Sequence, residues 1–175
     1  MLRDGVGFYA FFGYGWWLAG TTHLGGAAVE VATSLGAVIT VALLVVGRRL
    51  SDRSAGRRLP AVWRRRFVVV NAVQWLLIAA AAGACGVLGV PALIAPLVAV
   101  IVGGHFMPLA TLFERPSMRV PGMLLVAVGL AGVVVWVLGA AHPVVLTVVG
   151  VGCALTLWGT AVWSLAGRTA GEPFA

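Results

Sequence analysis

Charged residues are scarce in this chain, and lysine is absent. Only 10% of the 175 residues are charged, while 61% are hydrophobic. Soluble globular chains carry ~25% charged residues, so this composition excludes a soluble domain. Apolar runs of ~20 residues recur instead, which predicts a helical protein that crosses a membrane several times. The length suits one compact bundle and leaves no room for a second domain.

Motifs for catalysis and for cofactors are also missing. The sequence contains no phosphate-binding loop, no dinucleotide fingerprint, no nucleophile elbow and no zinc-protease motif. Its two cysteines, Cys85 and Cys153, lie inside apolar runs, and neither has a partner at ligand spacing. Buried free thiols are the expected state of both. The sequence therefore predicts no metal and no cofactor.

The positive charge comes from arginine alone and gathers in one stretch. Eight of the twelve arginines fall between Arg48 and Arg66, against the single acid Asp52. In a soluble protein a net charge of +7 would indicate nucleic acid. Between two apolar runs, the positive-inside rule is the better explanation. We therefore expect a cytoplasmic loop over 47–66 that attracts anionic lipid headgroups, and no nucleic-acid partner.

Six apolar runs are predicted to span the membrane, with tight turns at 89–91 and 140–143. If the basic loop is cytoplasmic, both termini are cytoplasmic and all twelve arginines fall on that side. The predicted fold is an all-α bundle of six transmembrane helices forming a single domain. The Gly, Ala, Val and Arg richness is typical of a high-GC bacterial genome, which indicates a bacterial inner-membrane protein. The predicted spans are about 5–22, 26–46, 67–88, 92–113, 121–139 and 144–166.

One group of polar residues is predicted near the outer surface. Glu30 lies about one turn inside the second span, and His23 and His142 lie in outer turns. A carboxylate beside imidazoles makes a plausible proton site, because burial raises the pKa of a carboxyl group and a nearby imidazolium lowers it. The alternative is that all three side chains simply meet water at the interface.

A second group is predicted nearer the cytoplasm. Asn71 and Gln74 share a face of the third span, at a depth similar to that of His105 in the fourth. These groups either bind a ligand or join the helices as polar contacts within the bilayer. Pro108 removes the hydrogen bond to the carbonyl of Gly104, so a kink and a cavity are expected beside His105.

Aromatic residues fill much of the first span. They could line a cavity and hold a cation through their ring faces, or they could pack against lipid and neighbouring helices. The candidate ligand contacts are Tyr14 and Trp17 in this span and Trp75 in the third.

Residues 105–113 read His-Phe-Met-Pro-Leu-Ala-Thr-Leu-Phe, and Arg115-Pro116 and an apolar span follow. Together with Gln74-Trp75, this segment resembles an uncharacterised family of small bacterial multi-span membrane proteins with a His-Phe-x-Pro-Leu-Ala-x-x-Phe pattern. The resemblance covers about residues 71–125. It implies a bundle of six or a similar number of helices with no assigned activity, and it supports a role for His105 and Pro108 beyond packing.

Three functions stay open at this point. The first is a transporter- or channel-like protein in which Glu30 takes a coupling proton. The second is a membrane enzyme of the lyase, isomerase or cyclase type, acting on a lipid or isoprenoid with Glu30 as general acid. The third is a structural or regulatory subunit that uses its glycine and alanine faces, which would also allow a homo-oligomer. In the first, the ligand contacts and cavity-shaping residues would be His105, Asn71, Gln74, Gly104 and Pro108.

Overall fold

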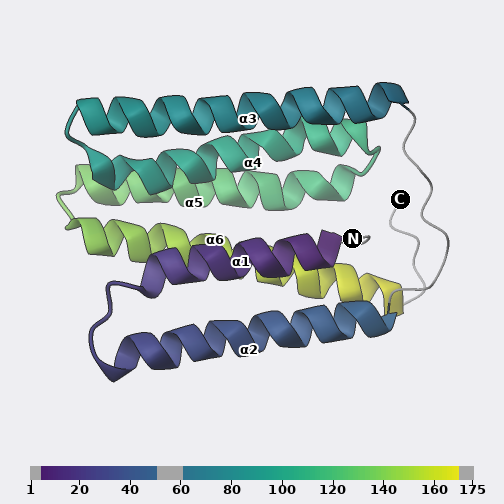
Figure 1. Ribbon diagram of the computed structural model, residues 1–175, viewed down its shortest axis with the longest axis horizontal. Helices are drawn as coiled ribbons and strands as arrows, with labels where there is room; N and C mark the ends of the chain where they lie inside the picture. The colour runs from purple at the N-terminus through teal and green to yellow at the C-terminus, as the bar shows by residue number, and fades with distance from the viewer. Residues whose placement is uncertain (1–4, 51–60, 170–175) are drawn as a thin grey trace. The chain divides into compact units, whose positions relative to one another are not determined.

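The computed structural model describes residues 5–50 and 61–169, and these ranges contain helices and turns but no strand (Figure 1). The prediction of an all-helical protein is therefore confirmed for the described chain. Two single-turn 3-10 helices, η1 (Pro91–Leu93) and η2 (Pro116–Met118), lead into α4 and α5. The α-helices are α1 (Gly5–Thr21), α2 (Ala27–Leu50), α3 (Ala61–Val87), α4 (Ile94–Leu112), α5 (Arg119–Val137) and α6 (His142–Thr169).

Five of these helices are long and apolar enough to cross a bilayer. They are α2 to α6, with membrane-length stretches of 22 to 26 residues. Helix α1 has 17 residues, which at 1.5 Å per residue reaches about 26 Å, short of the ~30 Å hydrocarbon core. The chain therefore has the composition of a multi-pass membrane protein. A sixth crossing by α1 and the cytoplasmic side of the termini stay predictions.

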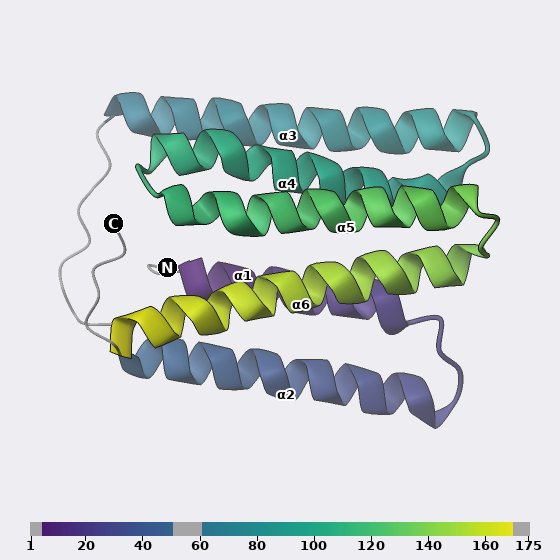
Figure 2. The same cartoon turned by 180° about the vertical axis from the view of Figure 1, so that it is seen from behind.

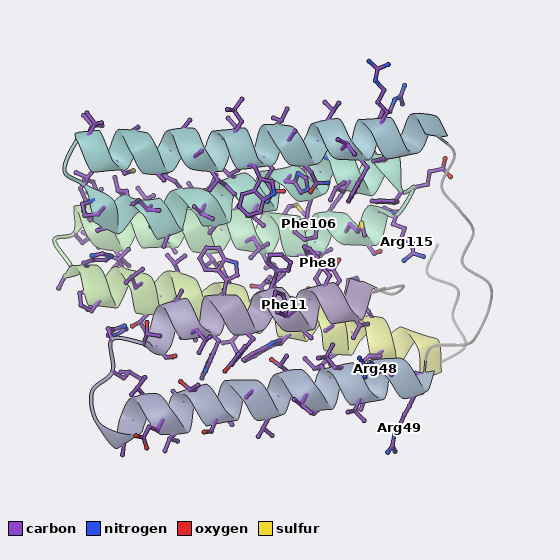
Figure 3. The ribbon with its side chains drawn as sticks, in the orientation of Figure 1. Phe8, Phe11, Arg48, Arg49, Phe106 and Arg115 are labelled. Carbon is purple, nitrogen blue, oxygen red and sulfur yellow. The ribbon has the colours of Figure 1, made fainter. Side chains whose placement is uncertain are left out.

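The helices extend further into the basic stretch than the apolar runs predict. Helix α2 continues through Arg48 and Arg49 to Leu50, and α3 already begins at Ala61. Figure 3 shows both arginines projecting from this end of α2. Arginine is a good helix former, and its long side chain can reach the interface from inside a helix. Residues 51–60, the middle of the predicted loop, lie outside the described residues.

The described helices divide into two compact units. Helices α1 and α2 form the first with the part of α6 that begins at Gly150. Helices α3, α4 and α5 form the second with the start of α6, up to Val149.

Two tryptophans tie the first unit together. The indole Nε1 of Trp17 on α1 donates to the carbonyl oxygen of Ala32 on α2, at 2.7 Å. The indole Nε1 of Trp158 on α6 donates to the carbonyl oxygen of Ala10 on α1, at 3.3 Å. The two indole rings also contact each other, with centroids 5.4 Å apart. Each bond reaches a carbonyl that already belongs to a helix.

Glycines make these carbonyls accessible. The Cβ of a helical residue points toward the N-terminus and covers the preceding turn. Gly36 comes four residues after Ala32, and a Cβ there would collide with Trp17. Gly13 comes three residues after Ala10, and a Cβ there would lie 2.5 Å from Nε1 of Trp158. Each indole therefore occupies the space that the missing side chain leaves.

Helices α1 and α6 also meet backbone to backbone. A Cβ added to Gly150 would lie 2.5 Å from the nitrogen and the Cα of Gly20. Figure 2 shows α6 passing in front of α1. Since lipid tails are as apolar as the side chains, such close packing and the indole hydrogen bonds hold helices together where the hydrophobic effect does not.

Gly13→Ala should lower stability by about 1–3 kcal/mol, because the new methyl group must displace the Trp158 indole. Gly15→Ala is the matched control on the same helix, since a Cβ there meets no atom within 4 Å. It should be neutral or gain about 0.5–1 kcal/mol from better helix propensity. Thermal unfolding in a mild detergent measures both. Equal midpoints for the two variants would contradict the proposed packing.

In the second unit, α4 lies between α3 and α5 (Figures 1 and 2). Its contact with α5 is very close. A Cβ on Gly103 would lie 2.6 Å from the Gly122 oxygen, and one on Gly122 would lie 2.8 Å from the Gly103 oxygen. About two turns after Gly122 on α5, a Cβ on Gly129 would lie 2.7 Å from the oxygen of Pro96 on α4. Helices α4 and α5 therefore form the tightly packed part of this unit.

Helix α3 is bound more loosely. No residue in its 18-residue apolar window is buried, and Trp75 and Leu76 are 62% and 70% exposed. It contacts the end of α4 through Phe67, whose ring lies 6.0 Å from that of Phe113, and Cys85 is buried near its other end.

Adjacent glycines on α4 offer a second test. Gly103→Ala should destabilise the protein by about 1–3 kcal/mol, because the added Cβ would meet the α5 backbone. Gly104→Ala should cost nothing, because the space around that position is open. The same unfolding assay distinguishes them. A larger loss for Gly104→Ala than for Gly103→Ala would show that α4 presents a different face to α5.

Candidate functional site

The outer residues predicted as a proton site are exposed. Glu30 lies in the first turn of α2 and is exposed, as is His23 in the preceding turn. A carboxylate at a helix N-terminus is stabilised by the helix dipole, which explains Glu30 without catalysis. His142 begins α6 and belongs to the other unit. A meeting of the three side chains stays a prediction.

The inner polar residues lie on facing parts of α3 and α4. The imidazole of His105 on α4 lies against the backbone of Val70 on α3. Gln74 is half-buried one turn after Val70, so both lie on the same face of α3. The structure therefore brings His105 against the helix that carries Asn71 and Gln74, as their predicted depths required.

Hydrogen bonds within the helices account for part of this polarity. The Nδ2 of Asn71 donates to the Phe67 oxygen of its own helix, at 2.9 Å. The imidazole of His105 approaches α3 from α4, and a polar contact between helices stabilises a membrane bundle by about 0.6 kcal/mol on average. Asn71 and His105 thus contribute to helix structure whether or not a ligand binds.

A groove opens between α3 and α4 directly beside the contact of His105 with Val70. Its volume is about 830 Å³, and Val70, the partner of His105, lies in its wall. Pro108, which the sequence marks as cavity-shaping, also lines it, although α4 remains helical from Ile94 to Leu112. The neighbouring Gly104 is exposed, with open space around its Cα. The described lining consists of Arg65, Arg66, Val69, Val70, Pro108, Thr111 and Leu112.

The groove changes from charged to apolar within one helical turn. Arg65 and Arg66 are exposed where the membrane-length part of α3 begins. Val69 and Val70 follow them at four-residue spacing, so they lie on the same faces about 6 Å further along. Sequence reasoning treated the two arginines as loop residues and missed this wall. The four-residue spacing of Arg65 from Val69 and of Arg66 from Val70 could have indicated this wall from the sequence.

The aromatic candidates take different places. The indole of Trp17 is used in packing, since it donates to Ala32. Tyr14 is half-buried on the same helix, whereas Trp75 is exposed on α3. Phe8 and Phe11, marked in Figure 3, are also exposed, at 40% and 65%. None of these residues lines the α3–α4 groove.

Residues 5–50 and 61–169 contain no group of three side chains suited to hold a metal ion. Comparison with protein-family models, with curated proteins and with solved structures gave no match. The groove's chemistry therefore has to be argued from its own residues.

The two inner polar residues should differ in their effect on stability. His105→Leu should cost about 0.6–1.7 kcal/mol, because it removes a polar contact between helices. Asn71→Leu should be close to neutral, because its amide bonds only to its own helix. Detergent unfolding of the two variants measures this difference. If Asn71→Leu is the more damaging, the amide has an interhelical role that its hydrogen bond does not explain.

Proposed function

We propose that this chain is a transporter-like membrane protein that binds an anionic small molecule in the α3–α4 groove. The observation that carries the proposal is the groove itself. Its volume of about 830 Å³ falls within the ~300–1,000 Å³ range of small-molecule sites. Two arginines lie at one end and His105 lies beside the wall.

Each group has a part in this proposal. Arg65 and Arg66 attract and hold the anionic group, since guanidinium groups bind carboxylates and phosphates in a bidentate manner. Pro108 keeps its part of the groove wall free of a long side chain. In this proposal His105, which lies against Val70 in the wall, and Gln74, one turn after Val70 on α3, contact a polar part of the ligand.

The exposure of Glu30 favours transport over the enzyme alternative. A general acid acting on a lipid or isoprenoid needs a site that excludes water. Glu30 is exposed at the beginning of α2. Such a carboxylate can still exchange a proton with the outer solution, which is the role that coupled transport would give it. The alternative of a structural or regulatory subunit gives no account of the groove.

The test is flux through proteoliposomes that contain the purified protein and a trapped pH dye. A panel of radiolabelled organic anions is added outside, and uptake and internal pH are followed. We expect at least one anion to accumulate. R65Q/R66Q should lower its initial rate by about thirtyfold, since two arginines each contribute about 1 kcal/mol to anion binding near a membrane.

The matched control is R48Q/R49Q, which removes the same charge from the end of α2. It should leave the initial rate within about twofold of wild type. Absence of flux for every anion, or equal losses in the two double variants, would rule out transport through this groove. Glu30→Gln should abolish the change in internal pH while the wild type shows it.

A further inference from the structure

We infer that the ligand of the α3–α4 groove is an anionic phospholipid that enters from the surrounding leaflet. Its phosphate would lie on Arg65 and Arg66, and an acyl chain would lie along Val69, Val70 and Leu112. This inference rests on the proposed function only in that both use the same groove. It names the chemical class of the ligand and the side from which it comes.

The polarity of the lining matches such a molecule. Of the seven described lining residues, two are cationic and none is acidic, while Val69, Val70, Pro108 and Leu112 are apolar. The charged part and the apolar part are separated by one turn of α3, about 6 Å. A phospholipid makes the same change from phosphate to hydrocarbon at the membrane interface.

Thr111 adds a third group for the phosphate. Its hydroxyl lines the groove and donates to the carbonyl of Met107 at 3.4 Å. This bond is long, because hydroxyl donors prefer about 2.7–2.8 Å, and other hydroxyls in the chain reach 2.7 and 2.8 Å. The Thr111 hydroxyl can therefore turn toward a phosphate oxygen at little cost.

The apolar wall argues against free inorganic phosphate as the ligand. A free phosphate would occupy the arginine end and leave Val69, which is 53% exposed, with nothing against it. The groove also lies on two helices of membrane length, so lipid chains are the molecules that surround it. Basic pockets between membrane helices are known to accept anionic headgroups.

Occupation should also stabilise the protein. Helix α3 has no buried residue in its apolar window, and its contacts among the described helices include α4 and η1. A lipid that touches both walls of the groove would add contacts between α3 and α4. Binding to the folded state alone raises the unfolding temperature in proportion to the logarithm of ligand concentration.

The experiment uses the full chain in a nonionic detergent, with native mass spectrometry and thermal unfolding as readouts. The added probes are phosphatidylglycerol, phosphatidylcholine and inorganic phosphate. We expect phosphatidylglycerol adducts and a raised unfolding temperature, with neither effect from the other two probes. R65Q/R66Q should weaken phosphatidylglycerol binding about thirtyfold, the factor that corresponds to about 1 kcal/mol for each arginine.

Two further variants locate the site. R48Q/R49Q should weaken phosphatidylglycerol binding clearly less than R65Q/R66Q, because Arg48 and Arg49 attract headgroups at the surface without lining the groove. Thr111→Val should weaken binding without changing the unfolding temperature of the lipid-free protein. Equal binding of phosphatidylcholine, stabilisation by inorganic phosphate, or equal losses in the two double variants would overturn the inference. A preference for phosphatidylglycerol without anion flux would reject the transport proposal and support the lipid site. Anion flux without a lipid preference would support transport and reject the lipid site.

Discussion

The structure depends on how helices are joined in a medium that offers no hydrogen bonds and no hydrophobic driving force between them. In the first unit, an indole N–H donates a hydrogen bond to a helix carbonyl, and a nearby glycine leaves the space that the indole needs. Trp17 with Gly36 and Trp158 with Gly13 repeat this arrangement on two helix pairs. In the second unit, glycines on α4 and α5 let the two helix backbones approach each other closely.

The groove follows from uneven packing within the second unit. The face of α4 that carries Gly103 packs against α5, so α3 contacts a different face of α4. There Pro108 and Thr111 are exposed, and α3 presents valines and arginines in place of small residues. The contact of His105 with Val70 and the ring contact between Phe67 and Phe113 keep the helices paired. The space that these contacts leave is the site to which we assign the ligand.

The sequence predicted the helices because apolar runs of membrane length leave little choice of structure. It also predicted turns at 89–91 and 140–143; the glycines with positive φ are Gly89, at +69°, and Gly139, at +84°, which lies one residue before the second predicted turn. The predicted spans also require a reversal between residues 113 and 121, but they do not predict its backbone form, since Glu114 takes φ +52° at the end of α4 without being glycine. The carbonyl of Ala110 accepts the N–H of Arg115 there, which closes the helix.

The candidate site was only partly predictable. Depth in the membrane placed His105 near α3, because depth follows from counting residues. The role of Trp17 could not be assigned, since an aromatic residue in a span suits a cavity or a packing contact equally well. The groove was missed because the arginines at 65 and 66 were placed in a loop, whereas α3 begins four residues earlier, at Ala61. Helix ends near charged residues are set by the interface, which the apolar pattern does not mark.

The central claim is that an anionic lipid occupies the α3–α4 groove. The most direct measurement uses a photoactivatable phosphatidylglycerol, with the reactive group on its acyl chain, in vesicles that carry the protein. Peptide mapping after illumination then locates the labelled residues. The account predicts labels concentrated at Val69, Val70 and Leu112, and their loss when unlabelled phosphatidylglycerol is added. Labels spread evenly over exposed apolar residues such as Val31, Leu76 and Val137, with no loss on competition, would contradict it.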